Sequence, residues 1–332
     1  MTGGSTTCAG SVLAFTEYLH EQGIGVVWVY QADRGQVPSW ATAVRAGSAR
    51  HRYLAARARW WATDGVPMRI VDPDTKGGPL ERGPDSRVLV FVEPTVDRVG
   101  ADLVDWPLLS PRQHRPHQLP GEAGADLVVV PSQEVGERAA RAVGITCPSM
   151  VAAPLVERLP SRDQARARLG IESSIGVIGF LRLRDMPFPI AEVAAELPGH
   201  VLLTVEVDAV HAANVQVAAG PADVVAACDL LVTDTSPWAP IAARVGRPVV
   251  IFAPDLRDLL SRGPGLYARW PRDLPGPHAA SAADVVRTVR EAESAGWSVP
   301  ADRVVGHERF AALVDESVGS CARVLQAMRG DL

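Results

Sequence analysis

Four consecutive polar residues at the end of an apolar run are the first candidates for chemistry in the sequence. They are Thr233, Asp234, Thr235 and Ser236. The run predicts a buried strand at 229–234, and Pro237, with its fixed φ, suits the first position of a helix, so Ser236 is predicted to cap that helix. Hydroxyls and free amide groups at the carboxyl end of a parallel strand can bind an anion, in particular a diphosphate. The alternative interpretation is an ordinary helix cap.

Two arginines follow another predicted strand, at 175–181. They are Arg182 and Arg184. A guanidinium group at the carboxyl end of a parallel strand can neutralise a diphosphate and the charge that develops on a leaving phosphate. We therefore expect both arginines to bind phosphate. The alternative is an exposed ion pair with Asp185.

Three residues are candidates for a general base, which takes the proton of an attacking hydroxyl. Glu93 closes the predicted strand 87–93, Asp97 follows it closely, and His211 comes soon after the predicted strand 200–206. A carboxylate in a dry cleft can serve as a base as well as an imidazole can. The alternative for Glu93 is a solvated carboxylate at a strand end.

An arginine-rich segment, residues 34–63, contains no acidic residue. Arg45, Arg52 and Arg59 recur every seven residues, so on one helix, predicted at 39–58, they would share a face. Such a face could bind a phosphorylated, lipid-linked acceptor at a membrane surface. The alternative interpretation is a solvated helix face.

The charge balance excludes several classes of function. The 332 residues include 33 basic and 38 acidic ones, a net charge of −5, and Lys76 is the single lysine. Lys76 is followed by Gly77, so the chain has no Walker A loop. Bound phosphate would have to be held by arginines, hydroxyls or main-chain amides. The negative balance argues against a nucleic-acid partner, which would need a broad basic surface.

Neither a membrane span nor a metal site is expected. No apolar run approaches the ~18 residues of a span, and the N-terminus lacks the pattern of a signal peptide. We therefore expect a cytoplasmic protein. The four cysteines are Cys8, Cys147, Cys228 and Cys321. They are far apart and form no CxxC pair, which indicates buried thiols, and we expect neither a metal nor another cofactor.

Apolar, β-branched runs alternate with helical stretches along the whole chain, which is typical of βαβ units and parallel sheets. The predicted strands are 24–30, 67–71, 87–93, 126–132, 148–153, 175–181, 200–206, 214–219, 229–234 and 248–253. The predicted helices are 39–58, 133–143, 164–170, 187–196, 221–227, 237–245, 255–261, 281–294 and 307–328. Residues 154–163, rich in proline and charge, predict a domain boundary. Two doubly wound domains are expected, with a ligand beyond the carboxyl ends of their strands.

The segment that begins with the polar run resembles a known family. TDTSPWAPIAARVGRPVVIFAPDL, followed by Gly265, Tyr267 and DLPGPH, resembles the C-terminal lobe of the CDP-glycerol glycerophosphotransferases, the teichoic-acid primases and polymerases. IGFLRLRD is similar to a family segment that ends in Arg-Asp, which matches Arg184 and Asp185. A weaker resemblance extends over nearly the whole chain. It implies a GT-B fold, in which two Rossmann-like lobes face a cleft and the second lobe holds most of the CDP-alditol donor.

The chain departs from the family at four expected functional positions. The family motif close to WHGTPLK supplies a histidine as base, whereas the corresponding FVEPTVDRVG has neither histidine nor lysine. A second family histidine would fall near LLTVEVDAV and is also absent. In the C-terminal segment a serine is replaced by Pro237 and an aspartate by Ile241. Glu93 is the natural substitute for the first histidine, and His211 lies nearest to the second.

The resemblance and the residues together give one leading hypothesis. Residues 1–158 are expected to form the acceptor domain, 159–306 the donor domain, and 307–332 a helix that crosses back to the first domain. The implied activity moves an alditol phosphate from CDP-glycerol, or another nucleotide-linked donor, to a cell-wall polymer or lipid-linked acceptor. A peripheral contact with the inner face of the plasma membrane would suit such an acceptor. One alternative is a GT-B glycosyltransferase or epimerase-like enzyme that uses a nucleotide sugar, and another is a catalytically degenerate protein that binds a nucleotide or a partner.

Overall fold

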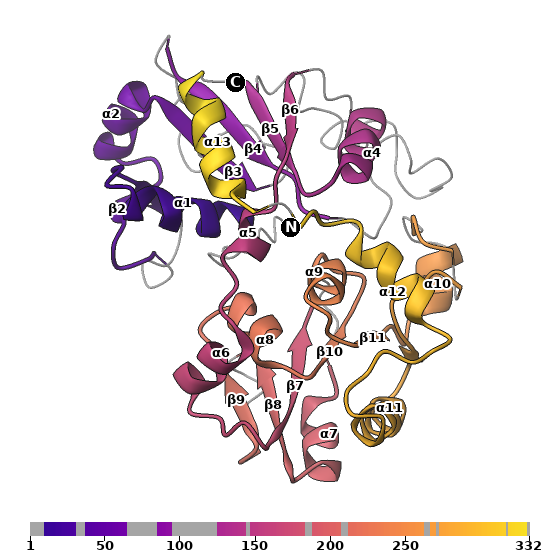
Figure 1. Ribbon diagram of the computed structural model, residues 1–332. Coiled ribbons are helices and arrows are strands. Elements are labelled where there is room, and N and C mark those ends of the chain that lie inside the picture. Colours follow the sequence, from indigo (N-terminus) through magenta and orange to yellow (C-terminus); the bar gives the residue numbers. More distant parts are fainter. Residues whose placement is uncertain are drawn as a thin grey trace. The chain divides into compact units, whose positions relative to one another are not determined.

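The computed structural model describes residues 10–30, 37–64, 85–94, 125–143, 147–182, 188–206, 212–261, 266–269, 272–316 and 318–330. These residues divide into two compact units. Unit 1 takes its residues from Met1–Glu93, Ser110–Glu157 and Ser317–Leu332, and unit 2 from Pro94–Leu109 and Arg158–Glu316. Each unit is built around its own parallel sheet (Figure 1).

Unit 2 contains a six-stranded parallel sheet in the order β12-β11-β10-β7-β8-β9. The strands are β7 (Gly176–Leu181), β8 (His200–Thr204), β9 (Val215–Val217), β10 (Leu230–Thr233), β11 (Val249–Phe252) and β12 (His278–Ala279). The chain starts at the centre, fills one side and then returns to fill the other, as in the doubly wound dinucleotide-binding fold. The order reverses between β7 and β10, and ligands of such sheets bind beyond the carboxyl ends of the strands at this point.

Helices cover both faces of the unit 2 sheet. They are α6 (Arg162–Leu169), α7 (Ile190–Glu196), α8 (Pro221–Ala227), α9 (Trp238–Arg244), α10 (Leu256–Ser261), α11 (Ala282–Ser294) and α12 (Val304–Ala311). On one face, Val193 of α7 and Val289 of α11 belong to the buried cluster that contains Phe180 of β7. On the other face α8 approaches β7 so closely that a Cβ on Gly179 would lie 2.8 Å from Val224 Cγ1. Burial on both faces explains why these strands read as continuous apolar runs.

Unit 1 contains a four-stranded parallel sheet in the order β3-β4-β5-β6 and a separate parallel pair, β1-β2. The strands are β1 (Val27–Tyr30), β2 (Thr42–Arg45), β3 (Trp60–Asp64), β4 (Arg87–Phe91), β5 (Leu127–Val130) and β6 (Ser149–Val151), and the helices are α1 (Ser11–Glu21), α2 (Ala49–Arg57), α4 (Gln133–Val143), α5 (Pro154–Glu157) and α13 (Ser320–Arg329). Phe15 of α1 and Val324 of α13 pack with Phe91 in one core cluster. Ser320 Oγ accepts a hydrogen bond from the main-chain nitrogen of Ala153 at 3.0 Å, which ties α13 to this unit.

Every predicted strand that falls within the described residues overlaps an observed strand, and the predicted strand 67–71 lies outside them. The single helix predicted at 39–58 is wrong. Its first part forms β2, which pairs with β1. The helix α2 begins only after Gly47, which lies between the strand and the helix and has a left-handed φ of 73°. Ser48 then caps α2, since its side chain accepts from the main-chain nitrogen of His51 at 3.0 Å.

The long C-terminal helix predicted at 307–328 is also wrong, because two helices occupy this segment. The first, α12, ends at Ala311, and α13 begins at Ser320. Gly319, the N-cap of α13, has a φ of 77°, a left-handed conformation that glycine adopts without steric cost. The break matters for the organisation of the chain, since α12 belongs to unit 2 and α13 to unit 1.

A buried ion cluster fastens the amino ends of β7 and β10. Asp229 precedes β10 and is 3% exposed, and its Oδ2 accepts from Arg166 at 2.6 Å and from the main-chain nitrogen of Val177 at 2.8 Å. Its Oδ1 pairs with Arg162. Arg166 also donates to the main-chain carbonyls of Ala227, Ser173 and Ile175 at 3.0, 3.0 and 3.1 Å. The cluster lies at the amino ends of the strands, at the edge of the sheet opposite to their carboxyl ends. It therefore stabilises the fold.

Candidate functional site

The candidate site lies at the carboxyl edge of the unit 2 sheet, where the strand order reverses. Thr233 ends β10 and pairs in register with Leu181, which ends β7. The polar run 233–236 therefore continues from one of the two strands that flank the expected crevice, and Arg182 continues from the other. Their role in phosphate binding stays a prediction, and the topology brings them to one edge of the sheet.

All four side chains of the polar run are buried. Exposure is 0% for Thr233, Asp234 and Ser236 and 4% for Thr235. The hydroxyls of Thr233 and Ser236 are hydrogen-bonded to each other at 2.7 Å. Thr235 Oγ1, in contrast, is buried without a hydrogen-bond partner among the described residues. A buried hydroxyl left unpaired costs about 1–3 kcal/mol, which a ligand that accepts its hydrogen bond would recover.

The helix after the polar run begins one residue later than predicted. It starts at Trp238, and Pro237 is its N-cap, so the prediction that Ser236 is the N-cap is wrong. Ser236 Oγ nonetheless accepts a hydrogen bond from the main-chain nitrogen of Trp238 at 3.3 Å. Since α9 has only seven residues, its dipole alone does not make an anion site, and the buried side chains of the polar run are the candidate ligands.

Arg182 is held by a carboxylate that was not among the predicted site residues. Its Nε donates to Glu206 Oε1 at 2.5 Å, and the two side chains are 25% and 26% exposed. The main-chain nitrogen of Glu206 donates to the hydroxyl of buried Thr204 at 3.2 Å, which fixes the turn after β8. The pair orients the guanidinium of Arg182 at the carboxyl edge. The signal for this pair in the sequence was an acidic residue, Glu206, just past β8 and an arginine, Arg182, just past the neighbouring strand β7.

Glu93 follows β4 in unit 1 and contacts the first turn of α1. Its Oε1 accepts a hydrogen bond from the main-chain nitrogen of Ser11 at 3.0 Å, and the N-cap of α1, Gly10, has no side chain that could do this. Burial raises the pKa of Glu93, and the hydrogen bonds from Ser11 oppose this effect. A raised pKa brings a carboxylate closer to the range in which a general base is effective at neutral pH.

The raised pKa of Glu93 predicts a pH-dependent effect of Glu93→Gln on stability. The folded protein holds the carboxyl proton more tightly than the unfolded chain, so the wild type loses stability relative to the variant as pH rises above the ordinary glutamate value. The difference becomes constant above the raised pKa. Thermal denaturation of both proteins between about pH 4 and pH 8 measures it. If the wild type instead gained stability relative to Glu93→Gln as the pH rises, the expected direction of the pKa shift would be contradicted. Glu137→Gln, on the exposed side of α4, is the control.

The remaining predicted site residues either lie outside the described residues or belong to unit 1. Asp97, Arg184 and His211 lie outside the described residues. Arg45, Arg52 and Arg59 are all exposed in unit 1, but the prediction that they share one helix face is wrong. The first ends β2, the second belongs to α2, and the third follows α2.

Part of the motif that carries the family resemblance has a structural explanation. Arg247, of the Arg-Pro dipeptide, donates to the main-chain carbonyl of Ala226 at 3.1 Å, at the end of α8. Gly276, of the Pro-Gly-Pro run, lies so close to β11 that a Cβ there would be 1.6 Å from the carbonyl oxygen of Val249. Both residues maintain the fold of unit 2, whereas the role of the buried polar run 233–236 stays a prediction.

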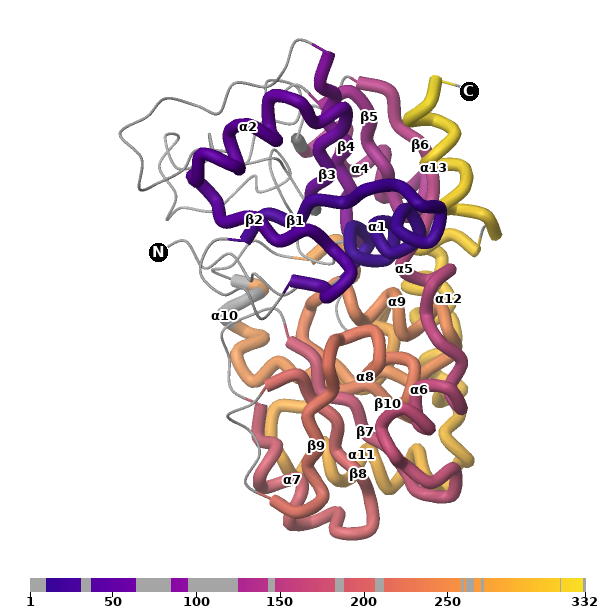
Figure 2. Tube along the Cα trace, turned by 90° about the vertical axis from the view of Figure 1, so that its left-hand side faces the viewer, coloured from indigo at the N-terminus to yellow at the C-terminus, as the bar shows by residue number. Residues whose placement is uncertain are grey.

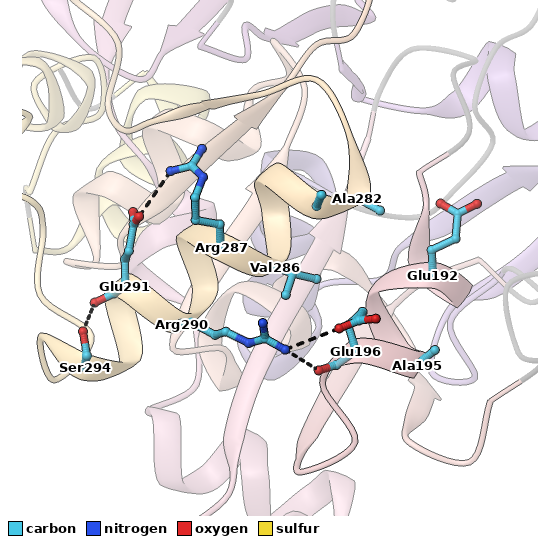
Figure 3. A pocket seen from close by; sticks show the side chains of 10 residues that line it. Glu192, Ala195, Glu196, Ala282, Val286, Arg287, Arg290, Glu291 and Ser294 are labelled. Atoms are coloured by element: carbon cyan, nitrogen blue, oxygen red, sulfur yellow. Dashed lines mark hydrogen bonds and ion pairs between the residues drawn. The ribbon is translucent and has the colours of Figure 1, made fainter.

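A surface groove between α7 and α11 is a less suitable site. Figure 3 shows the charged side chains that line it. Arg290 pairs with Glu196 at 3.5 Å, and Arg287 pairs with Glu291 at 3.2 Å and with Asp284. The groove is lined only by residues of α7 and α11 and not by residues at the carboxyl ends of the strands, where ligands of such sheets bind.

The thiols give no sign of a reactive or metal-binding centre in the described part of the chain. Cys228 and Cys321 are buried, Cys147 is partly exposed, and Cys8 lies outside the described residues. Burial raises the pKa of Cys228 to about 12, so this thiol stays protonated. Among the described residues, no three His, Cys, Asp or Glu side chains gather as a metal site requires. None of the helices described is long and apolar enough to cross a bilayer.

Solved structures with a similar fold include those of a wall teichoic acid polymerase, TagF. One of them matches with a TM-score of 0.75 and 16% sequence identity, over 99% of this chain and 87% of that chain. A variant of the same polymerase, soaked with CDPG, matches with a TM-score of 0.77 and 17% identity over the same shares. The chain has the GT-B fold.

The GT-B fold confirms the predicted fold class, and it agrees with the resemblance to the teichoic-acid polymerases at the level of architecture. Identity of 16–17% shows the fold and does not by itself transfer an activity. No protein-family profile matches the chain. No curated protein matches it either. The function of this GT-B protein therefore has to be argued from its site.

Proposed function

We propose that the chain is a transferase that moves an alditol phosphate from a CDP-linked donor to a cell-wall polymer or lipid-linked acceptor. The observation that carries the proposal is the buried polar run 233–236, with the unpaired hydroxyl of Thr235, beside the reversal of strand order. The family resemblance of this same run and the fold shared with TagF, one structure of which was soaked with CDPG, support the choice of donor.

In the proposed reaction a hydroxyl of the acceptor attacks the phosphorus that carries the alditol. A new P–O bond forms, the bond from this phosphorus to the oxygen that bridges to CMP breaks, and CMP leaves with the electron pair. The hydroxyl proton passes to a base, for which we propose Glu93, with Asp97 and His211 as the other candidates. Arg182 and Arg184 neutralise the phosphates, and hydroxyls of the polar run donate hydrogen bonds to them. The proposal includes no metal or other cofactor.

The acceptor and the cellular location complete the proposal. Arg45, Arg52 and Arg59 are proposed to bind a phosphate-bearing acceptor, as separate exposed side chains and not as one helix face. A transferase that uses a cytidine nucleotide and a lipid-linked acceptor would act in the cytoplasm, in contact with the inner face of the plasma membrane.

The hydroxyl of Thr235 gives a sharp test of the donor site. Thr235→Val keeps the volume and removes the hydroxyl, and we expect it to weaken the binding of CDP-glycerol about tenfold, the effect of one lost hydrogen bond of ~1.4 kcal/mol. Isothermal titration calorimetry measures this. Thr288→Val is the matched control, because Thr288 is also 4% exposed and its hydroxyl also lacks a partner in the part of the chain that the structure describes, yet it lies on α11.

Three outcomes, two of the calorimetry and one of a turnover assay with an acceptor, would contradict the proposal. Equal loss of affinity in both valine variants would mean that the hydroxyl of Thr235 does not contact the donor. A preference of the wild type for a UDP sugar over CDP-glycerol would favour a nucleotide-sugar glycosyltransferase. Binding of CDP-glycerol without any turnover would favour a degenerate nucleotide-binding protein.

A further inference from the structure

Six exposed arginines between residues 45 and 87 of unit 1 form no ion pair with a described residue. They are Arg45, Arg50, Arg52, Arg57, Arg59 and Arg87, and together they are named the arginine surface. Three exposed arginines of unit 2 are paired: Arg168 with Asp223, Arg287 with Glu291 and Arg290 with Glu196. In a chain of net charge −5, the arginine surface is thus a local concentration of positive charge that no described residue pairs with, and such a concentration attracts anions.

The arginine surface follows one continuous stretch of unit 1. Arg45 ends β2, α2 carries three of the arginines, and Arg59 connects α2 to β3. Arg87 begins β4 beside Arg59, and its main-chain nitrogen donates to the carbonyl oxygen of Arg59 at 3.0 Å. Figure 2 shows α2 next to the β1-β2 pair, and α2 contacts β2 directly. A long ligand could therefore contact several of these guanidinium groups at once.

The arginine surface lies far from the proposed base. Arg59 and Arg87 mark the amino ends of β3 and β4, whereas Glu93 lies beyond the carboxyl end of β4. Six residues of extended chain, at about 3.3 Å each, place Glu93 about 20 Å from Arg87. The part of a ligand that binds to the arginine surface therefore lies far from the group of that ligand that reacts.

The side chains around the arginines indicate a dissolved polyanion more than a lipid surface. The guanidinium of Arg57 lies 5.3 Å from the ring centre of Tyr53, and that of Arg87 lies 5.7 Å from the ring centre of Trp60. Such contacts orient a guanidinium without neutralising it. The buried residues of α2 are His51 and Ala55, and its exposed residues are three arginines, one tyrosine and two alanines. A helix that lies in a membrane needs an apolar exposed face.

We propose that the arginine surface binds a linear phosphodiester chain, at a distance from the end that reacts. The inference rests on the proposed function, because it assigns this chain to the polymeric acceptor of the transfer reaction. Phosphates spaced along a flexible polymer suit guanidinium forks that are spread over β2, α2 and the starts of β3 and β4. The surface would keep the growing polymer bound between transfers.

The test compares two triple variants that lose the same charge. Arg45→Gln/Arg52→Gln/Arg59→Gln changes the arginine surface, and Arg168→Gln/Arg287→Gln/Arg290→Gln changes paired arginines of unit 2. Binding of fluorescent poly(glycerol phosphate) of defined length is measured by anisotropy over a range of salt concentrations. The first variant is expected to bind at least about tenfold more weakly. For this variant, the slope of the logarithm of the binding constant against the logarithm of the salt concentration is expected to become shallower by about 0.7 for each phosphate contact that is lost. The second variant should bind like the wild type.

Two outcomes would overturn the inference. One is equal weakening in both variants, which would reflect net charge alone. The other is binding to phosphatidylglycerol vesicles that the first variant loses while it keeps its affinity for the polymer, which would make the surface a membrane contact. Transfer by the wild type to a short glycerophosphate acceptor is measured in parallel. Absence of that transfer, with polymer binding lost only in the first variant, would contradict the proposed function and leave the polymer surface supported.

Discussion

Asp229→Asn is expected to lower the free energy of unfolding by about 3–5 kcal/mol, because it removes one partner from a buried ion cluster. Arg166 is 3% exposed and would keep its charge without its carboxylate. The same carboxylate oxygen also bonds Val177 of β7, so the change loosens the two central strands of unit 2 together. At a shift of about 2–4 °C per kcal/mol for a domain of this size, the midpoint of thermal denaturation should fall by about 10 °C.

The matched control for Asp229→Asn is Asp223→Asn, which also removes one negative charge from a paired aspartate. Asp223 lies 3.9 Å from Arg168, whose side chain is 65% exposed, and an ion pair of this kind contributes about 0–1 kcal/mol. Circular dichroism of the two variants and the wild type during heating gives the comparison. Similar midpoints for the two variants would show that the cluster around Asp229 does not hold the sheet together.

Gly276→Ala is expected to destabilise unit 2 by about 3 kcal/mol, since no side chain fits at this position. The added Cβ would lie 1.6 Å from the carbonyl oxygen of Val249, and this neighbour is main chain of β11 and cannot rotate away. The Pro-Gly-Pro segment or the strand must therefore shift. Urea denaturation measures the loss, and the region that leads into β12 should become the most susceptible to proteolysis.

Gly199→Ala is the control for this effect. No atom lies within 4 Å of a Cβ built on Gly199, and its φ is not in the left-handed region. Its stability should therefore stay within about 0.5 kcal/mol of the wild type. If Gly276→Ala proves equally harmless, the close approach to Val249 does not constrain the fold.

The sequence predicted most strands because burial on both faces leaves a continuous apolar run, as in β5 and β10. Prediction from the sequence failed where the local residue pattern and the tertiary contacts favour different secondary structures. Residues of β2 read as the start of a helix, but pairing with β1 and the left-handed Gly47 decided otherwise. The break at Gly319 was hidden inside an amphipathic pattern that suits one long helix or two short ones equally well.

At the candidate site, too, the sequence predicted local features but not the contacts that depend on the tertiary structure. The polar run 233–236 was predicted at a strand end, and its place beside the reversal of strand order depends on the crossover between β7 and β10, which spacing alone does not reveal. The contact of Arg182 with Glu206 joins residues 24 positions apart, so it required the register of β7 with β8. The cluster of Arg166 with Asp229 escaped prediction because single charged residues in a helix and before a strand look like surface residues.

The decisive assay of the proposed transfer is the release of CMP from CDP-glycerol in the presence of a glycerophosphate-primed acceptor. We expect CMP to appear in equal amount with the new phosphodiester. We also expect Glu93→Gln, which keeps an oxygen to accept from the main-chain nitrogen of Ser11, to lower the rate about 100-fold or more. No acceptor-dependent release of CMP by the wild type would contradict transfer, and an unchanged rate in Glu93→Gln would contradict the assignment of Glu93 as the base.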